Sequence, residues 1–150
     1  MTDIPVYLVG AAGTPDADNP HCSPCITCAL HHEASETYEG GLLGMLDSGA
    51  FPNAIDYGVW QRLNLPIVGK DTLHTVSGVQ EIYICEGRLL IGALDTTIPI
   101  QERFSISPMR QNGHMCDLIL GRRILTLFDF GYSVADGWYL RTPDDPAHRG

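Results

Sequence analysis

The stretch that decides the fold reads Gly40-Gly41-Leu42-Leu43-Gly44-Met45-Leu46-Asp47-Ser48-Gly49-Ala50. An apolar run ends at Asp47, and Ser48 and Gly49 follow where the chain must turn. We therefore expect the carboxylate of Asp47 at a corner between a strand and a loop. A glycine lets backbone amides approach a carboxylate, and a small hydroxyl group can hold the loop by a hydrogen bond. This arrangement suits acid–base work on a bound water, although the tripeptide alone also suits an ordinary turn.

The chain after this stretch has mostly the pattern of β-structure. One helix is expected at 54–65, where apolar residues recur about every four positions and Pro66 stops the run. Near the C-terminus, 117–121 predicts a buried strand that breaks at a glycine, and 122–128 predicts a short helix. The remaining segments, rich in β-branched and aromatic residues, predict antiparallel strands at 73–76, 79–85, 88–94 and 97–106 and a closing hairpin at 132–134 and 137–141.

The order of three short motifs resembles the retropepsin-like aspartic peptidases. That family carries two apolar residues, then Asp, Thr or Ser, Gly, and Ala or Ser; later it has a glycine-tipped flap, and then two apolar residues before a glycine. The resemblance covers about residues 39–141 and is closer to the cellular and bacterial single-domain members than to the compact viral enzymes. The motifs here are Met45-Leu46-Asp47-Ser48-Gly49-Ala50, Thr75-Val76-Ser77-Gly78 and Leu118-Ile119-Leu120-Gly121-Arg122.

The resemblance implies a mostly β, closed, barrel-like retropepsin (acid protease) fold with one or two short helices, with residues 1–150 forming a single domain. It also implies a homodimer, because the family's active site needs two such loops and this chain has one. Two close carboxylates cannot both ionise cheaply, so Asp47 and its counterpart would share a proton. Together they would activate a water that attacks a bond of a peptide or protein substrate, without a cofactor.

The same resemblance assigns roles to the neighbours of Asp47. Ser48 would hydrogen-bond across the two loops, and Gly49 would let the backbone pass close to the carboxylates. Ala50 and Gly121 would support the loop from beneath. The flap would be the turn Val76-Ser77-Gly78-Val79, in a hairpin that closes over an extended peptide and excludes water. The pattern of an ordinary hairpin turn is the same.

A cysteine-rich segment separates a first strand at 5–9 from the rest of the fold. Residues 14–38 carry three prolines and three close cysteines without helical or strand periodicity, so we expect an irregular insertion. The Cys-x-x-Cys-x-x-Cys spacing also suits zinc or iron–sulfur sites. Against that alternative, there is no second Cys-x-x-Cys pair, and Cys85 and Cys116 lie in apolar runs. We therefore expect no metal, and keep as the less favoured alternative a site made of Cys22, Cys25, Cys28 and His31.

The composition limits the possible partners. With 150 residues and 44% apolar content, the chain can fill one core without disulfides. A formal charge of −9 disfavours nucleic acids and anionic membranes, because both require clustered Lys and Arg. Five cysteines are an odd number, so they cannot all pair within the chain. The start of the sequence has neither a basic region nor a long apolar run. Both observations favour a cytoplasmic protein with reduced thiols. The end of the chain, 142–150, is expected to fray.

Two functions are consistent with these patterns. The first is an aspartic endopeptidase that binds an extended peptide by strand pairing and cleaves it with the Asp47 pair. The second is a non-catalytic retropepsin-fold module that binds peptides or proteins, with or without a metal in the cysteine-rich loop. Pro52 is a reason to retain the second function, because a proline near the active loop limits strand pairing with a substrate. Asp117, Asp129 and Asp136 lack a following hydroxyl and glycine, so structural or solvated roles are expected for them.

Overall fold

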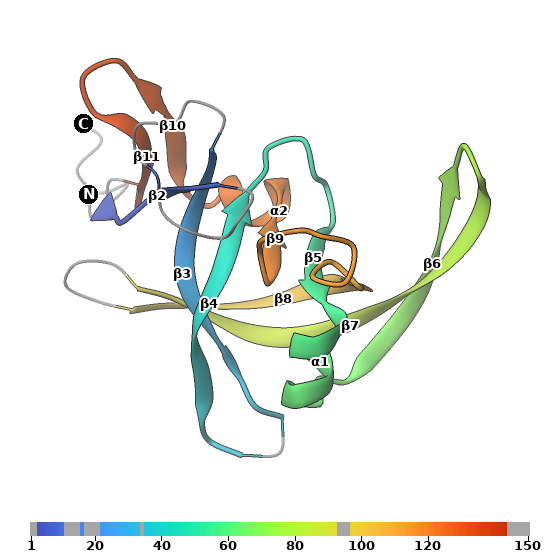
Figure 1. Cartoon of the computed structure of the whole chain (residues 1–150). Helices are drawn as coiled ribbons and strands as arrows, with labels where there is room; N and C mark the ends of the chain where they lie inside the picture. Colours follow the sequence, from blue (N-terminus) through green and yellow to red (C-terminus); the bar gives the residue numbers. More distant parts are fainter. Residues whose placement is uncertain (1–2, 11–15, 17–21, 34, 93–96, 144–150) are drawn as a thin grey trace.

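The computed structural model describes residues 3–10, 16, 22–33, 35–92 and 97–143. The fraying expected for 142–150 falls mostly on 144–150, which lie outside the described residues. Figure 1 shows strands that wrap around a centre, with short helices between them. The elements are β1 (Asp3–Ile4), β2 (Tyr7–Val9), β3 (Ser23–His31), β4 (Tyr38–Leu46), β5 (Asn53–Asp56), α1 (Tyr57–Leu63), β6 (Ile67–Thr75), β7 (Gly78–Gly92), β8 (Thr97–Ser107), β9 (Leu118–Leu120), α2 (Arg122–Leu125), β10 (Asp129–Ser133) and β11 (Gly137–Arg141).

The main sheet closes on itself. Its strand order is β2-β3-β4-β9-β5-β8-β7-β6, and an additional pairing of β3 with β7, for example Cys28 with Ile91, completes the ring. The β4–β9 and β5–β8 pairs are parallel, and the other pairs are antiparallel. A smaller antiparallel sheet has the order β1-β11-β10 and joins the two ends of the chain. The expectation of a mostly β, closed, barrel-like fold with short helices is confirmed.

The core lies inside this ring. Alternation along the strands places every second side chain inward, as in β7, where Cys85, Leu89 and Ile91 are fully buried. Helix α1 covers the core with Val59 and Leu63 and ends at Asn64, which adopts the left-handed conformation typical of a helix end. Neither helix of the described residues has the length and apolar content to cross a membrane.

The segment 14–38 is not an irregular insertion throughout. Residues 23–31 form the nine-residue strand β3, which pairs with β2, β4 and β7. Its cysteines supply part of the apolar surface that makes this possible, because Cys25 and Cys28 are buried beside Ile26 and Leu30. The sequence prediction was wrong here because a strand buried by several partners lacks the alternation of a half-exposed strand.

Several element boundaries also differ from the prediction. The helix expected at 54–65 begins only at Tyr57, because the four residues before it form β5 between β8 and β9. The two strands expected at 79–85 and 88–94 are one strand of fifteen residues, β7. Pairing with β8 continues through the expected break, with Glu86 opposite Arg103 and Gly87 opposite Glu102. The hairpin turn before Gly78, the buried strand before Gly121 and the closing hairpin are confirmed.

Candidate active site

Asp47 lies at the first position after β4. Its backbone N–H donates to the carbonyl oxygen of Leu120 at 3.0 Å, which fixes the end of β4 against β9. Its side-chain Oδ1 accepts a hydrogen bond from the backbone N–H of Gly49 at 2.9 Å, and its carbonyl oxygen accepts one from Ala50 at 3.1 Å. Asp47 is half-buried, whereas Ser48 and Gly49 are exposed. The loop therefore curls around the carboxylate and leaves its outer face open.

A second loop supports the first from below. The backbone N–H of Arg122 donates to the carbonyl oxygen of Ala50 at 2.8 Å. A Cβ atom at Gly121 would collide with that same carbonyl oxygen, so the close approach requires glycine. The structure therefore brings Ala50 and Gly121 into direct contact beneath the turn that carries Asp47.

Asn53 holds these two loops together, and the sequence analysis did not single it out. Its Oδ1 accepts the backbone N–H of Gly121 at 2.8 Å, and its Nδ2 donates to the carbonyl oxygen of Arg103 at 3.3 Å. The side chain is fully buried. The available signal was a polar amide at the start of an apolar strand, since a buried amide must find partners.

Two acidic side chains on or next to the strands around β4 are structural. Asp56 caps α1 by accepting the N–H of Gly58 at 3.0 Å, and its other oxygen accepts the N–H of Arg110 at 2.9 Å. Asp117 accepts the N–H of Leu43 at 2.9 Å and pairs with the Arg110 guanidinium at 3.0 Å. Both carboxylates are thus engaged in fixing β4, α1 and the turn before β9. The role of Asp56 as a helix cap was missed by the sequence analysis.

The expected flap residues lie on a hairpin that projects from the barrel. Figure 1 shows β6 and the start of β7 extending away from the other strands. Val76 and Ser77 form its turn, where the hydroxyl of Thr75 donates to the carbonyl oxygen of Gly78 at 3.0 Å. Val76 is fully exposed, and Val79 is 68% exposed. Two apolar side chains thus stand in solvent at the tip of the hairpin.

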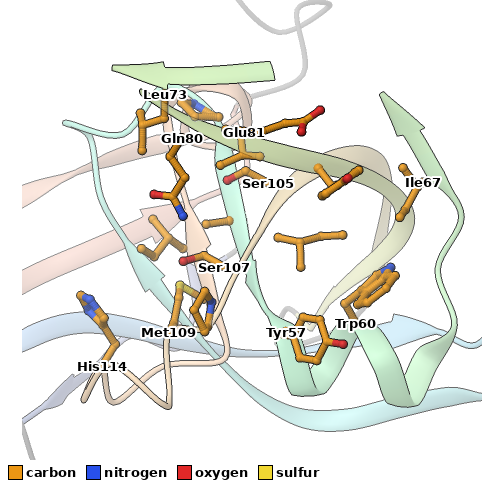
Figure 2. Close-up of a pocket in the computed structure, with 17 residues that line it drawn as sticks. Tyr57, Trp60, Ile67, Leu73, Gln80, Glu81, Ser105, Ser107, Met109 and His114 are labelled. Carbon is orange, nitrogen blue, oxygen red and sulfur yellow. The ribbon is translucent and has the colours of Figure 1, made fainter. Parts of the chain in front are cut away.

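A pocket of about 500 Å³ lies under this hairpin. Figure 2 shows Leu73 and Gln80 of the hairpin on one side, and Tyr57 and Trp60 of α1 on another. Asp47 does not line it. Its walls nevertheless include Ile119, whose backbone pairs with Met45 two positions before Asp47. The residues that line it are Pro52, Ala54, Tyr57, Trp60, Ile67, Leu73, Gln80, Glu81, Ile82, Tyr83, Ser105, Ile106, Ser107, Pro108, Met109, His114 and Ile119.

The side chains of the alternative metal site do not form a cluster, because the described part of the chain contains no group of three His, Cys, Asp or Glu side chains that could hold a metal ion. Burial raises the pKa of Cys25 and of Cys28 to about 12, which opposes the thiolate form that metals bind. The thiol of Cys28 contacts the carbonyl oxygen of Leu42 at 3.6 Å. The remaining candidate, His31, packs edge-on against Tyr38 with ring centroids 4.9 Å apart.

Comparison with known proteins supports the fold. No family model matches the chain, and no curated protein matches it in sequence. One similar solved structure is described as a retropepsin-like aspartic protease from Rickettsia conorii. The similarity has a TM-score of 0.53 and 14% sequence identity, and it covers 95% of this chain and 94% of that one. The chain therefore has a retropepsin-like fold over most of its length.

Proposed function

We propose that this protein is an aspartic endopeptidase whose active site is formed by the Asp47 carboxylates of two copies of the chain. The observation that carries the proposal is the position of Asp47. It follows a buried strand, accepts the Gly49 N–H at 2.9 Å, and lies on a loop held from below by Gly121. The fold similarity to a solved structure described as an aspartic protease adds support.

The chemistry requires two carboxylates with one proton between them. The ionised carboxylate accepts a proton from a water, and the water oxygen forms a bond to the carbonyl carbon of the scissile peptide. The protonated carboxyl donates a hydrogen bond to the developing oxyanion. When the tetrahedral intermediate collapses, the C–N bond breaks and a carboxyl group passes its proton to the leaving amine. Water is consumed, and the two carboxyl groups return to their starting state.

The proposal requires a dimer, because the active site needs two Asp-Ser-Gly loops and the chain has one. The chain contains a single Asp-Ser-Gly, and the buried or half-buried acids Asp56 and Asp117 are occupied by structural hydrogen bonds. A second Asp47 from a symmetric partner is the source of the second carboxylate that the proposal needs. In such a pair, the exposed Ser48 side chains could meet across the two loops.

The substrate class is an extended peptide or an unfolded segment of a protein. The projecting hairpin β6–β7 offers a cover with an apolar tip, and the pocket beneath it offers a place for a substrate side chain. Closure of the hairpin would exclude water from the bond under attack.

The test is cleavage of an unfolded protein substrate by the wild type and by Asp47→Asn, with and without pepstatin, from about pH 4 to about pH 7. The matched control is Asp129→Asn, because Asp129 is an exposed acid on β10. We expect activity in the wild type and in the control, and none in Asp47→Asn. Equal cleavage by Asp47→Asn would refute the proposal.

A mixing experiment tests whether the two copies share one site. Increasing amounts of Asp47→Asn are added to a fixed amount of wild type and allowed to exchange subunits. If each site needs both carboxylates, activity falls as mixed dimers replace wild-type dimers. Activity that stays constant, or a protein that sediments only as a monomer while it cleaves, would contradict the shared site. A folded dimer that binds peptides without cleaving them would favour the non-catalytic binding module.

A further inference from the structure

A second pocket, of about 450 Å³, lies beside the loop that carries Asp47. Figure 1 shows α2 next to the chain that leaves this loop. The residues that line the pocket are Phe51, Arg122, Arg123 and Thr126. Phe51 is 58% exposed and follows Asp47 by four positions. Four residues of chain span at most about 14 Å, so the pocket is close to the carboxylate proposed to act on the substrate.

The side chain of Arg122 carries a positive charge that no acidic group of the described residues neutralises. Every other Lys and Arg in that part of the chain is ion-paired, except Arg88. The Arg122 guanidinium instead lies 5.4 Å from the centroid of the Phe51 ring. The ring attracts the cation but does not use up its N–H groups in the way a carboxylate would. Arg122 is thus an exposed cation with free donors in a chain of formal charge −9.

The other polar groups of the pocket are occupied within the protein. The Nε–H of Arg123 donates to the buried carboxylate of Glu102 at 2.9 Å, so this pair is held in place and its charges cancel. The hydroxyl of Thr126 donates to the carbonyl oxygen of Arg122 at 2.7 Å. The charge left for a ligand is that of Arg122. It balances one carboxylate, whereas a phosphate group, with a charge of about −1.5 to −2, would stay partly unbalanced.

We infer that Arg122 binds a carboxylate of the peptide on which the protein acts, within about four residues of the scissile bond. Phe51 holds the guanidinium from one side, and the planar fork of N–H groups can bind both oxygens of a carboxylate. The carboxylate belongs to an Asp or Glu side chain or to the C-terminus of the peptide, and the test below distinguishes these sources. The inference rests on the proposed function only for the way the peptide crosses Asp47.

The test is isothermal titration calorimetry with peptides, which does not require cleavage. The probes are short peptides in which a hydroxyethylene group replaces the scissile amide, with Glu or Gln placed at each nearby position in turn. A second set has no acidic side chain and ends in a free carboxylate or an amide at increasing distances from that group. At one position, or at one length, we expect the carboxylate form to bind about fivefold more tightly than its neutral match. This difference should shrink as the salt concentration rises from about 0.05 M to about 0.5 M.

Replacing the guanidinium should remove the difference. Arg122→Gln keeps the backbone N–H that donates to Ala50, so the loop that carries Asp47 retains this support. The matched control is Arg88→Gln, because Arg88 is also exposed and unpaired but lies on β7 and does not line the pocket. We expect the preference for the carboxylate form to vanish in Arg122→Gln and to persist in Arg88→Gln. Arg122→Lys, which keeps the charge without the planar fork, should retain a part of it.

The outcomes separate this inference from the proposed function. A preference that survives Arg122→Gln, or equal binding of charged and neutral peptides throughout, overturns the inference even if the wild type cleaves substrates. Absence of peptide binding overturns it as well. Loss of the preference together with loss of the dimer, measured by sedimentation, would place Arg122 between two copies and would also overturn it. A preference that Arg122→Gln abolishes in an intact dimer that cleaves nothing supports the carboxylate site and refutes hydrolysis.

Discussion

The carbonyl oxygen of Ala50 lies so close to Gly121 that a Cβ atom at residue 121 would collide with it. Gly121 has no side chain to collide with this oxygen, and the next residue, Arg122, donates its N–H to the same oxygen at 2.8 Å. The two residues come from loops far apart in the sequence, and the backbone of Ala50 leaves room only for glycine at residue 121. The loop that carries Asp47 is thus held by a backbone contact that is possible only because residue 121 is a glycine.

The first prediction concerns this contact. Gly121→Ala should destabilise the fold by about 1–3 kcal/mol, because the new methyl group must displace the backbone of Ala50. Cleavage should fall further than stability alone explains, since the shift moves the loop of Asp47. Urea unfolding and kcat/KM measure the two effects. Gly40→Ala is the control, because a Cβ atom there meets nothing within 4 Å; equal behaviour of the two variants would contradict the prediction.

A second prediction concerns the buried carboxylate of Asp56. Asp56→Ala removes the acceptor for the backbone N–H groups of Gly58 and Arg110, which lie 3.0 and 2.9 Å from its oxygens. The loss of a helix cap and of a second hydrogen bond should lower the free energy of unfolding by about 2–3 kcal/mol. Thermal or urea unfolding measures it. Asp71→Ala, at an exposed position of β6, should change it by less than about 1 kcal/mol; similar losses in both would refute the role of Asp56.

The third prediction tests the hairpin as a flap. Val76→Asp places a charge at a fully exposed position, so the free energy of unfolding should change by no more than about 0.5 kcal/mol. If the tip closes over the substrate, kcat/KM should fall about tenfold or more, because the charge must be desolvated on closure. Val134→Asp is the control, because Val134 is exposed at the tip of the β10–β11 hairpin. Unchanged kcat/KM in Val76→Asp would show that the tip does not cover the substrate.

The fourth prediction is a loss of stability at alkaline pH. Burial, and then the charge of Asp117, raise the pKa of Cys28 from 9.0 to about 12. The folded state thus holds the thiol proton more tightly than the unfolded state. The stability that this difference contributes is complete below about pH 9 and is lost as the pH rises towards about 12. Urea unfolding between about pH 8 and about pH 11 should show the decline.

The variant Cys28→Ala isolates this contribution. It lowers stability at neutral pH by removing a buried sulfur atom, but it also removes one titrating thiol. Above about pH 9 its stability should therefore fall less steeply, by about 1.4 kcal/mol per pH unit, than that of the wild type. Parallel curves for the two proteins would show that Cys28 does not ionise on unfolding in this range.

The local signals of the sequence were sufficient for much of the candidate site. A strand that ends at Asp47, a turn of Ser48 and Gly49, and a glycine after the buried strand at 118–120 are all short-range patterns, and the structure has each of them. The hairpin turn before Gly78 belongs to the same class. These features depend on neighbours within a few positions, so the sequence order reveals them.

The features that were missed depend mainly on distant partners; the cap that Asp56 places on α1 is the exception, because Gly58 is its near neighbour in the chain. Asn53 binds a backbone group 68 positions away, and Asp56 binds one 54 positions away. Strand β3 is buried by β4 and β7, which follow it in the chain, so its prolines and cysteines suggested an irregular segment when considered alone. Periodicity and turn chemistry carry no information about which strands will become neighbours.

The parallel pairing of β4 with β9 also has a consequence for synthesis. Leu43 and Asp117, which are hydrogen-bonded between these strands, lie 74 positions apart. At about 5–20 residues per second, a ribosome needs about 4–15 s to travel that distance. During this interval the nascent chain has the Asp47 loop but none of its support from Leu120, Gly121 and Arg122. The site is therefore completed late, and a polypeptide interrupted before β9 carries the aspartate without the scaffold that positions it.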